Sequence, residues 1–161
     1  MGLPEDKGAY VLVSRLDAAA TLEIGRLGRF SLRPGWYAYV GSACGAGGLR
    51  ARIARHLDPD KRFHWHIDYL LQAARPVEVW FAVSDRKLEA EWAEMMARSP
   101  EWRVAIPRFG ASDYRRARHS HLFYRRRPAR FEQFAARVRE IFLPEVQPRR
   151  FLLEPAAESE A

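Results

Sequence analysis

A sequence of 161 residues, of which 48% are hydrophobic, is long enough for one domain with its own core. The formal net charge is +7, and most of the 27 basic residues are arginines, whose planar guanidinium suits phosphate recognition. This charge favours a nucleic acid as partner, although a genome rich in G and C would also enrich arginine. The chain has no run of about 18 apolar residues and no apolar signal core at its start, so we expect a cytoplasmic protein without a membrane partner. A single cysteine, Cys44, excludes an internal disulfide.

The first part of the chain has the pattern of β-strands. Residues 9–16 are β-branched and apolar, which is typical of a buried strand. Residues 21–35 alternate around glycines and end at Pro-Gly, which predicts a strand, a turn and a second strand. Residues 36–41 have the composition of a further strand. We therefore expect one small antiparallel sheet in this region.

The rest of the chain alternates amphipathic helices with short strands. Leu49, Ile53 and Leu57 lie along one face of a predicted helix over residues 48–57. Ser84 can cap a later helix. The remaining predicted elements are a helix at 64–74, a strand at 76–83, a helix at 85–99, short strands at 102–107 and 121–124, and a helix at 129–143. Together they predict an α+β fold in which a small central antiparallel sheet is flanked by helices, with an added amphipathic C-terminal helix.

A glycine-rich turn, GSACGAGGL over residues 41–49, joins a predicted strand to the first helix. Such a turn can present backbone N–H groups to a phosphate at the helix start. It has neither the lysine of a P-loop nor the glycine spacing of a dinucleotide-binding turn. A flexible connection between strand and helix is an equally good interpretation.

The histidines lie in one part of the sequence, at His56, His64, His66, His119 and His121. Their spacing differs from the Cys/His spacing of zinc fingers, which argues against structural zinc. Packing against the core or contact with phosphate are the other roles open to them. Carboxylates that could hold a divalent metal are more numerous, and helical pattern alone does not choose among Asp68, Glu78, Glu89, Glu91, Glu94 and Asp113.

Two tripeptides on predicted strands, GAY at residues 8–10 and YVG at residues 39–41, are followed by Arg52 on the next helix. This arrangement resembles the GIY-YIG nuclease superfamily, with Ala9 and Val40 in place of the two isoleucines. The segments GRLG, YVGSA, GGLRARIARHL, HWHIDYLL, LEAEWA and FGASD…HSHLFY resemble, in order, a prokaryotic branch of small uncharacterised domains that also occur fused to endonuclease-III-like glycosylases. The resemblance predicts a GIY-YIG-like domain over residues 7–124. From their own pattern and composition, the residues that follow are expected to form a C-terminal helical extension over 125–145 and a disordered tail over 146–161.

The resemblance implies a metal-dependent DNA endonuclease that hydrolyses phosphodiester bonds in DNA repair or recombination. Tyr10 matches the tyrosine that acts as general base on the attacking water, and Tyr39 matches the tyrosine that positions the water or phosphate. Arg52 matches the arginine that contacts the scissile phosphate, and His56 falls beside the nucleophile. Glu89 resembles the glutamate that holds one Mg²⁺ or Mn²⁺ ion. Ala90 and Tyr114 stand where the branch often has cysteines, which weakens a zinc interpretation further.

To act as a general base, Tyr10 must be able to ionise. A free tyrosine titrates near pH 10 and is therefore almost entirely protonated at pH 7. We expect Arg52 or the metal to lower the Tyr10 pKa by favouring the phenolate. DNA is the expected partner, and the residues expected to contact it are Arg50, Arg55, His64, His66, Arg115, Arg116 and Arg118. Two alternatives stay open: a non-catalytic nucleic-acid-binding module that keeps the nuclease fold, and a zinc-stapled interaction protein.

Overall fold

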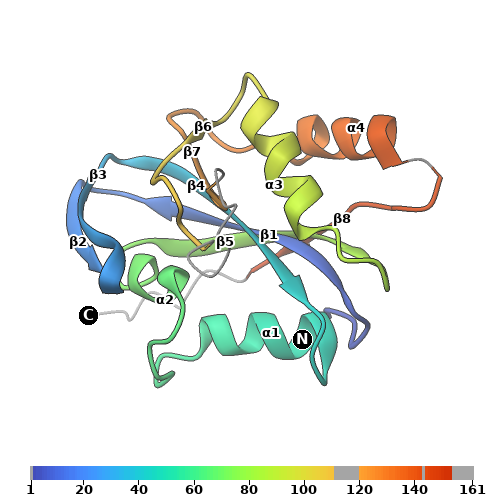
Figure 1. Ribbon diagram of the computed structural model, residues 1–161, viewed down its shortest axis with the longest axis horizontal. Coiled ribbons are helices and arrows are strands. Elements are labelled where there is room, and N and C mark those ends of the chain that lie inside the picture. Colours follow the sequence, from blue (N-terminus) through green and yellow to red (C-terminus); the bar gives the residue numbers. More distant parts are fainter. Residues whose placement is uncertain (1, 111–119, 143, 154–161) are drawn as a thin grey trace, which may run out of the picture.

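The computed structural model describes residues 2–110, 120–142 and 144–153. Its centre is a six-stranded sheet in the order β6-β7-β4-β1-β5-β8, in which every neighbouring pair is antiparallel. The predicted α+β class is therefore confirmed (Figure 1). The strands are β1 (Gly8–Leu16), β4 (Gly35–Ala43), β5 (Arg75–Val83), β6 (Arg103–Val104), β7 (Leu122–Arg125) and β8 (Arg149–Leu152).

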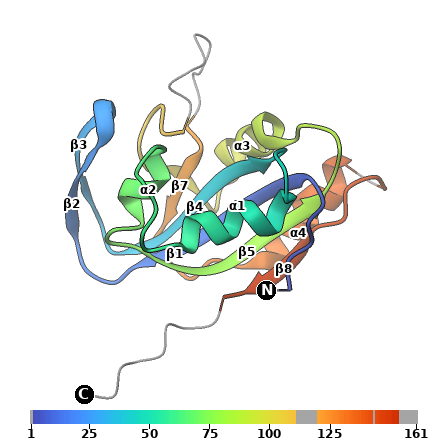
Figure 2. The same ribbon diagram turned by 90° about the horizontal axis from the view of Figure 1, so that it is seen from below.

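Helices cover both faces of this sheet, so the central strands are buried on both sides. Helices α1 (Gly48–Leu57) and α2 (His66–Leu70) lie on one side, and α3 (Glu89–Arg98) and α4 (Phe131–Phe142) lie on the other (Figures 1 and 2). Successive side chains of a strand point to opposite faces. Tyr10 and Leu12 accordingly pack in the cluster beneath α1 and α2, whereas Val11 packs in the cluster beneath α3 and α4.

The pairing of β1 with β4 brings the two tripeptides together. Tyr10 lies opposite Gly41, and Leu12 lies opposite Tyr39. A Cβ atom built on Gly41 would lie 2.3 Å from both the Cζ and the Oη atoms of Tyr10, so the Tyr10 ring lies directly over this glycine. Both tyrosine side chains belong to the same buried cluster, which places them on one face of the sheet.

Three expected elements differ in the structure. Strands β2 (Ala20–Ile24) and β3 (Gly28–Leu32) form a separate two-stranded sheet, because β1 pairs with β4 and β5 instead. Helix α2 is shorter than expected at both ends: the Asp68 side chain caps the backbone N–H groups of His64 and Trp65 before its first residue, and residues 71–73 form a turn. Helix α3 begins at Glu89 with Leu88 as its N-cap residue, and the Ser84 hydroxyl accepts a hydrogen bond from the Arg86 N–H in the preceding turn.

The C-terminal part of the chain packs on the central sheet. Helix α4, expected as an extension, buries Phe134 and Val138 in the cluster that contains Trp80 of β5. The Phe134 and Trp80 rings are stacked with centroids 5.0 Å apart. The disordered tail expected over 146–161 is wrong for residues 149–152, which form β8, while residues 154–161 lie outside the described part of the chain.

A buried carboxylate explains why β8 is ordered. Arg150 of β8 donates to Glu78 Oε2 from Nη2 at 2.7 Å and from Nε at 3.0 Å. Glu78 is 4% exposed, and its Oε1 accepts a hydrogen bond from Trp80 Nε1 at 2.6 Å. A buried carboxylate without a cationic partner would be costly, so this ion pair holds β8 against β5. Among the described residues, no helix has both the length and the apolar composition needed to cross a membrane.

Candidate active site

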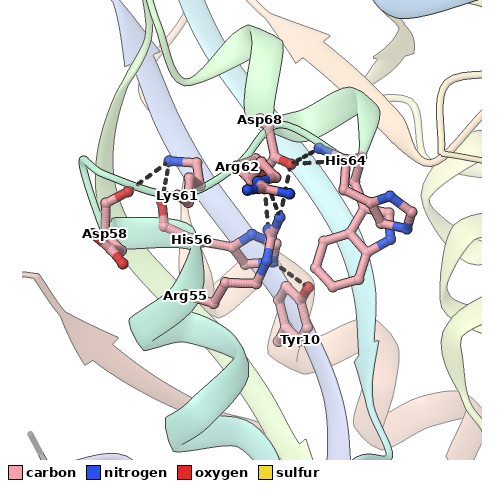
Figure 3. Close-up of polar contacts among 9 residues, drawn as sticks. Tyr10, Arg55, His56, Asp58, Lys61, Arg62, His64 and Asp68 are labelled. Atoms are coloured by element: carbon pink, nitrogen blue, oxygen red, sulfur yellow. Dashed lines mark hydrogen bonds and ion pairs between the residues drawn. The ribbon is translucent and has the colours of Figure 1, made fainter.

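The centre of the candidate site is a hydrogen bond between Tyr10 of β1 and His56 of α1. The Tyr10 Oη and His56 Nε2 atoms are 2.6 Å apart, and each residue is 1% exposed (Figure 3). Leu49, Ile53 and His56 follow one another at helical spacing on the buried face of α1, which turns the imidazole toward the sheet. The end of α1 is held by Lys61, whose Nζ donates to the carbonyl of His56 at 2.8 Å (Figure 3).

Tyr39 and Arg52 lie beside this pair. The Tyr39 ring centroid is 6.4 Å from that of Tyr10 and 6.1 Å from that of His56. The half-buried guanidinium of Arg52 lies over the Trp65 ring, with Cζ 4.4 Å from the ring centroid. Its positive charge opposes the rise in the pKa of both tyrosines and contributes to the low pKa of His56. The stacking therefore fixes a cation at the edge of the tyrosine pair.

Glu89 reaches the same place from the opposite side of the sheet, as the first residue of α3. Its Oε1 accepts a hydrogen bond from His121 Nδ1 at 3.1 Å, and the same Nδ1 lies 3.2 Å from the carbonyl oxygen of Val40. Both partners of Nδ1 are acceptors, so this nitrogen carries a proton. The Glu89 side chain is 27% exposed, and its negative charge raises the pKa of both Tyr10 and Tyr39. The structure thus brings together all five of the predicted catalytic residues.

Residues 9–143 match the model of a protein family described as a domain of unknown function, DUF123. The match spans most of the 161 residues. The chain belongs to the DUF123 family. Comparison with curated proteins and comparison with solved structures each gave no match. The matched region of this DUF123 protein contains every residue of the site and also includes α4.

A buried ion pair supports the arginine side of the site in this DUF123 domain. Asp68 of α2 is 0% exposed and accepts hydrogen bonds at 3.0 Å from both terminal nitrogens of Arg55 (Figure 3). Asp68 Oδ2 also accepts from the backbone N–H groups of His64 and Trp65, at 2.8 and 2.9 Å. The Arg55 Cζ atom lies 4.2 Å from the Trp65 ring centroid. The Trp65 ring therefore contacts two guanidinium groups, one anchored by Asp68 and one belonging to Arg52.

Both tyrosines are neutral phenols at pH 7. Burial raises the pKa of Tyr10 well above its ordinary value of 10, Tyr39 and Glu89 add to the rise, and Arg52 opposes it. Burial also raises the pKa of Tyr39. Arg52 lowers the Tyr10 pKa, as expected, but the net pKa stays above the ordinary value. The arginine acts in the expected direction, but loss of phenolate hydration outweighs it.

The imidazole of His56 is neutral as well. Burial lowers the pKa of His56 from 6.5 to about 3, and the negative charge of Asp68 only partly opposes this. Its second ring nitrogen, Nδ1, has no hydrogen-bond partner within the parts of the chain that are described. Tyr10 and His56 therefore form an uncharged, hydrogen-bonded pair.

The low pKa of His56 predicts that this protein becomes less stable as the pH falls. Between about pH 6.5 and pH 3 the unfolded chain binds a proton at His56 that the folded chain does not bind. The free energy of unfolding is therefore expected to fall as the pH falls through this window, by up to about 1.4 kcal/mol per pH unit from this group. The free energy of unfolding, measured by urea denaturation at pH 7, 6, 5 and 4, should depend less steeply on pH in His56→Gln than in the parent protein. The exposed His64→Gln variant serves as control and should keep the parental slope, whereas equal slopes in all three proteins would contradict the assignment.

Glu89 can hold a divalent metal only with help from water or substrate. The described residues contain no group of three or more histidine, cysteine, aspartate and glutamate side chains suited to a metal ion. Mg²⁺ often binds to one or two carboxylates and fills its other positions with water and substrate phosphate oxygens. A single, partly exposed carboxylate beside the tyrosine pair fits this kind of ion and does not fit a caged structural metal.

The predicted DNA-contacting residues have diverse surroundings. Arg50 donates to the carbonyl of Leu3 and pairs with Glu5, which ties the start of the chain to α1. His64 is exposed, and the His66 Nδ1 atom accepts a hydrogen bond from the Gly110 N–H at 2.8 Å. Several candidates lie outside the described residues, so the structure does not place them: Asp113, Tyr114, Arg115, Arg116, Arg118 and His119.

Sequence reasoning did not select three residues that build the site: Trp65, Asp68 and His121. His121 immediately precedes β7, which pairs with β4 so that Leu122 lies opposite Tyr39. The sequence of a short strand such as β7, with HSH before it, gives no indication of which strand it pairs with. The signal for Asp68 was stronger, because an acidic residue near the start of a predicted helix is typical of a cap.

Proposed function

We propose that this DUF123 protein is a metal-dependent DNA endonuclease of the GIY-YIG type, which hydrolyses phosphodiester bonds in DNA repair or recombination. The observation that carries the proposal is the convergence of two tyrosines, a histidine, an arginine and a glutamate from four separate elements. Each stands at a position that resembles the corresponding position of the GIY-YIG pattern. Packing alone does not explain one positive and one negative side chain, Arg52 and Glu89, whose charges both act on two buried phenols.

The Tyr10–His56 pair supplies a route for the proton of the attacking water. As the water oxygen forms its bond to phosphorus, a water proton passes to Tyr10 Oη and the phenol proton passes to His56 Nε2, 2.6 Å away. This relay avoids a free phenolate, which burial and Glu89 both disfavour. The incoming phosphate and the nearby Asp68 are negative, and both favour the imidazolium that the relay creates.

Arg52 and Glu89 act on the phosphate. The Arg52 guanidinium offers planar donors to the phosphate oxygens, on which negative charge grows in the transition state. Glu89 would hold the divalent ion, with His121 orienting its carboxylate. When bound, Mg²⁺ or Mn²⁺ supplies positive charge that stabilises the leaving 3′ oxygen. The P–O3′ bond breaks, and the released 3′ oxygen takes a proton from solvent.

Cleavage assays test this proposal directly. Branched, nicked and damaged DNA duplexes should be cut in the presence of Mg²⁺ or Mn²⁺ and left intact in EDTA. Glu89→Gln removes the metal-binding charge and should slow cleavage more than about a hundredfold, since a metal contributes several kcal/mol to the transition state. Glu91→Gln is the matched control, because Glu91 lies on the same helix and is paired with Arg86. Equal cleavage by Glu89→Gln and the parent protein would remove Glu89 from the mechanism.

The burial of Tyr10 favours a second candidate, a nucleic-acid-binding module that keeps the fold but does not cut. A phenol that is 1% exposed and has a raised pKa is a poor base unless its proton can leave. This candidate predicts tight, salt-sensitive DNA binding with no cleavage of any substrate in either metal. The same assays separate the two functions.

A further inference from the structure

A strongly basic groove lies on the β6–β7 edge of the sheet, away from the tyrosine pair. It consists of two adjoining hollows with volumes of about 190 and 420 Å³, which share Arg103 and Tyr124. We call it the β7-edge groove. Its lining includes the arginines Arg33, Arg103, Arg125, Arg126 and Arg127.

Most of the positive charge of the groove is not neutralised by carboxylates of the described chain. Its lining includes one carboxylate among the described residues, Glu101, which is held by Ser99 and by Arg137 at 3.0 Å. Arg125 is fixed in place by Gln133, whose Oε1 accepts from Arg125 Nη1 at 3.0 Å. The remaining four arginines are exposed and form no ion pair within the described chain.

Hydrogen bonds and ring contacts hold the walls of the groove in place. The Tyr124 hydroxyl donates to the carbonyl of Pro34 at 2.8 Å, and its ring lies 5.1 Å from that of Tyr37. The Arg125 guanidinium lies over the Trp102 ring, 5.6 Å from its centroid. A set of guanidinium groups without anionic partners among the described residues is suited to a polyanion that presents several phosphates.

Strand β7 connects the groove to the candidate active site. His121, which contacts Glu89, immediately precedes β7, and Arg126 immediately follows it. Five residues of extended chain span about 17 Å. Along B-DNA the same length covers about five base pairs, at 3.4 Å for each phosphate of one strand. A duplex lying along β7 could therefore contact both places.

We propose that the β7-edge groove binds the phosphate backbone of double-stranded DNA about five base pairs from the scissile phosphate. The binding follows from the groove alone, whereas its distance from the cut rests on the proposed nuclease function. The groove thus makes a duplex extending to one side of the cut a requirement for tight binding, and very short duplexes should bind poorly.

Binding without metal tests the groove independently of cleavage. Fluorescence anisotropy with a labelled duplex of about 25 base pairs in EDTA, over 50–200 mM NaCl, gives both the affinity and its salt dependence. The triple variant Arg103→Ala, Arg126→Ala, Arg127→Ala should bind at least about tenfold more weakly at 100 mM salt. Its slope of log K against log salt should shrink by about 0.9 for each lost phosphate contact. A matched triple variant, Arg26→Ala, Arg29→Ala, Arg139→Ala, removes the same charge at exposed positions elsewhere and should change both quantities much less.

The outcomes separate the groove from the nuclease function. Equal affinity and equal salt slope in the two triple variants would contradict the proposal that the groove binds DNA, whether or not the protein cuts DNA. Weaker binding by the groove variant alone, with no cleavage by the parent protein, would support the groove and contradict the nuclease function. Tighter binding of polyglutamate or duplex RNA than of duplex DNA would overturn the assignment of DNA as the occupant.

Discussion

Tyr10→Phe is expected to lower the rate of metal-dependent DNA cleavage by about a hundredfold to ten-thousandfold, the usual contribution of a positioned acid–base group. Phenylalanine keeps the ring that covers Gly41 and loses only the hydroxyl that contacts His56. DNA affinity and the folded structure should therefore change little. Single-turnover cleavage measured at saturating protein, together with anisotropy in EDTA, separates the chemical step from binding.

Tyr37→Phe is the matched control for this experiment. Tyr37 lies on the same face of β4 as Tyr39, but its hydroxyl donates to the carbonyl of Arg33 at 2.6 Å, away from His56. Its loss should cost about 1 kcal/mol of stability and leave cleavage nearly unchanged. The relay would be contradicted if Tyr10→Phe cut DNA at the parental rate, or if Tyr37→Phe lost as much activity as Tyr10→Phe.

Asp68→Ala is expected to destabilise the protein by about 3–5 kcal/mol, because it leaves the half-buried Arg55 guanidinium without its anion. It also removes the acceptor for the backbone N–H groups of His64 and Trp65 at the start of α2. Since Trp65 stacks on Arg52, the substitution should weaken phosphate contact as well as the fold. Urea denaturation at pH 7 measures the first effect, and cleavage by the folded fraction measures the second.

Glu94→Ala provides the comparison for Asp68→Ala. Glu94 pairs with Arg98 one helical turn away, and the two side chains are 51% and 80% exposed. Loss of an exposed pair of this kind should cost less than about 1 kcal/mol. A similar loss of stability in Glu94→Ala and Asp68→Ala would show that Asp68 does not act as a buried anchor.

Periodicity predicted the elements of this fold better than it predicted their partners. The first helix was expected to bury Leu49, Ile53 and Leu57, and the structure buries the first two together with His56. Leu57 is only half-buried, because the face of the helix that meets the sheet is turned toward Tyr10. Apolar spacing could not reveal this, since it counts only apolar residues and His56 is not one of them.

The site required information about which strands are neighbours. Strand alternation places Tyr37 and Tyr39 on one face without distinguishing them, and only the tripeptide pattern selected Tyr39. Glu89 could not be separated from Glu91 by helical pattern, because the difference lies in contact with His121 from a strand far along the chain. Order in β8 was equally hidden, since it depends on an ion pair between the buried Glu78 and the half-exposed Arg150.

Strand β8 has a consequence for the region that defines the family. The family match ends at residue 143, before β8 begins. A fragment limited to the matched residues would leave the outer side of β5 with unpaired backbone N–H and C=O groups, next to a Glu78 carboxylate that had lost Arg150. An exposed strand edge of that kind is a template for pairing with other chains. The short strand β8 thus replaces the long edge of β5 by a short one, and a fragment that ends at residue 143 is expected to aggregate more readily than one that extends to Leu152.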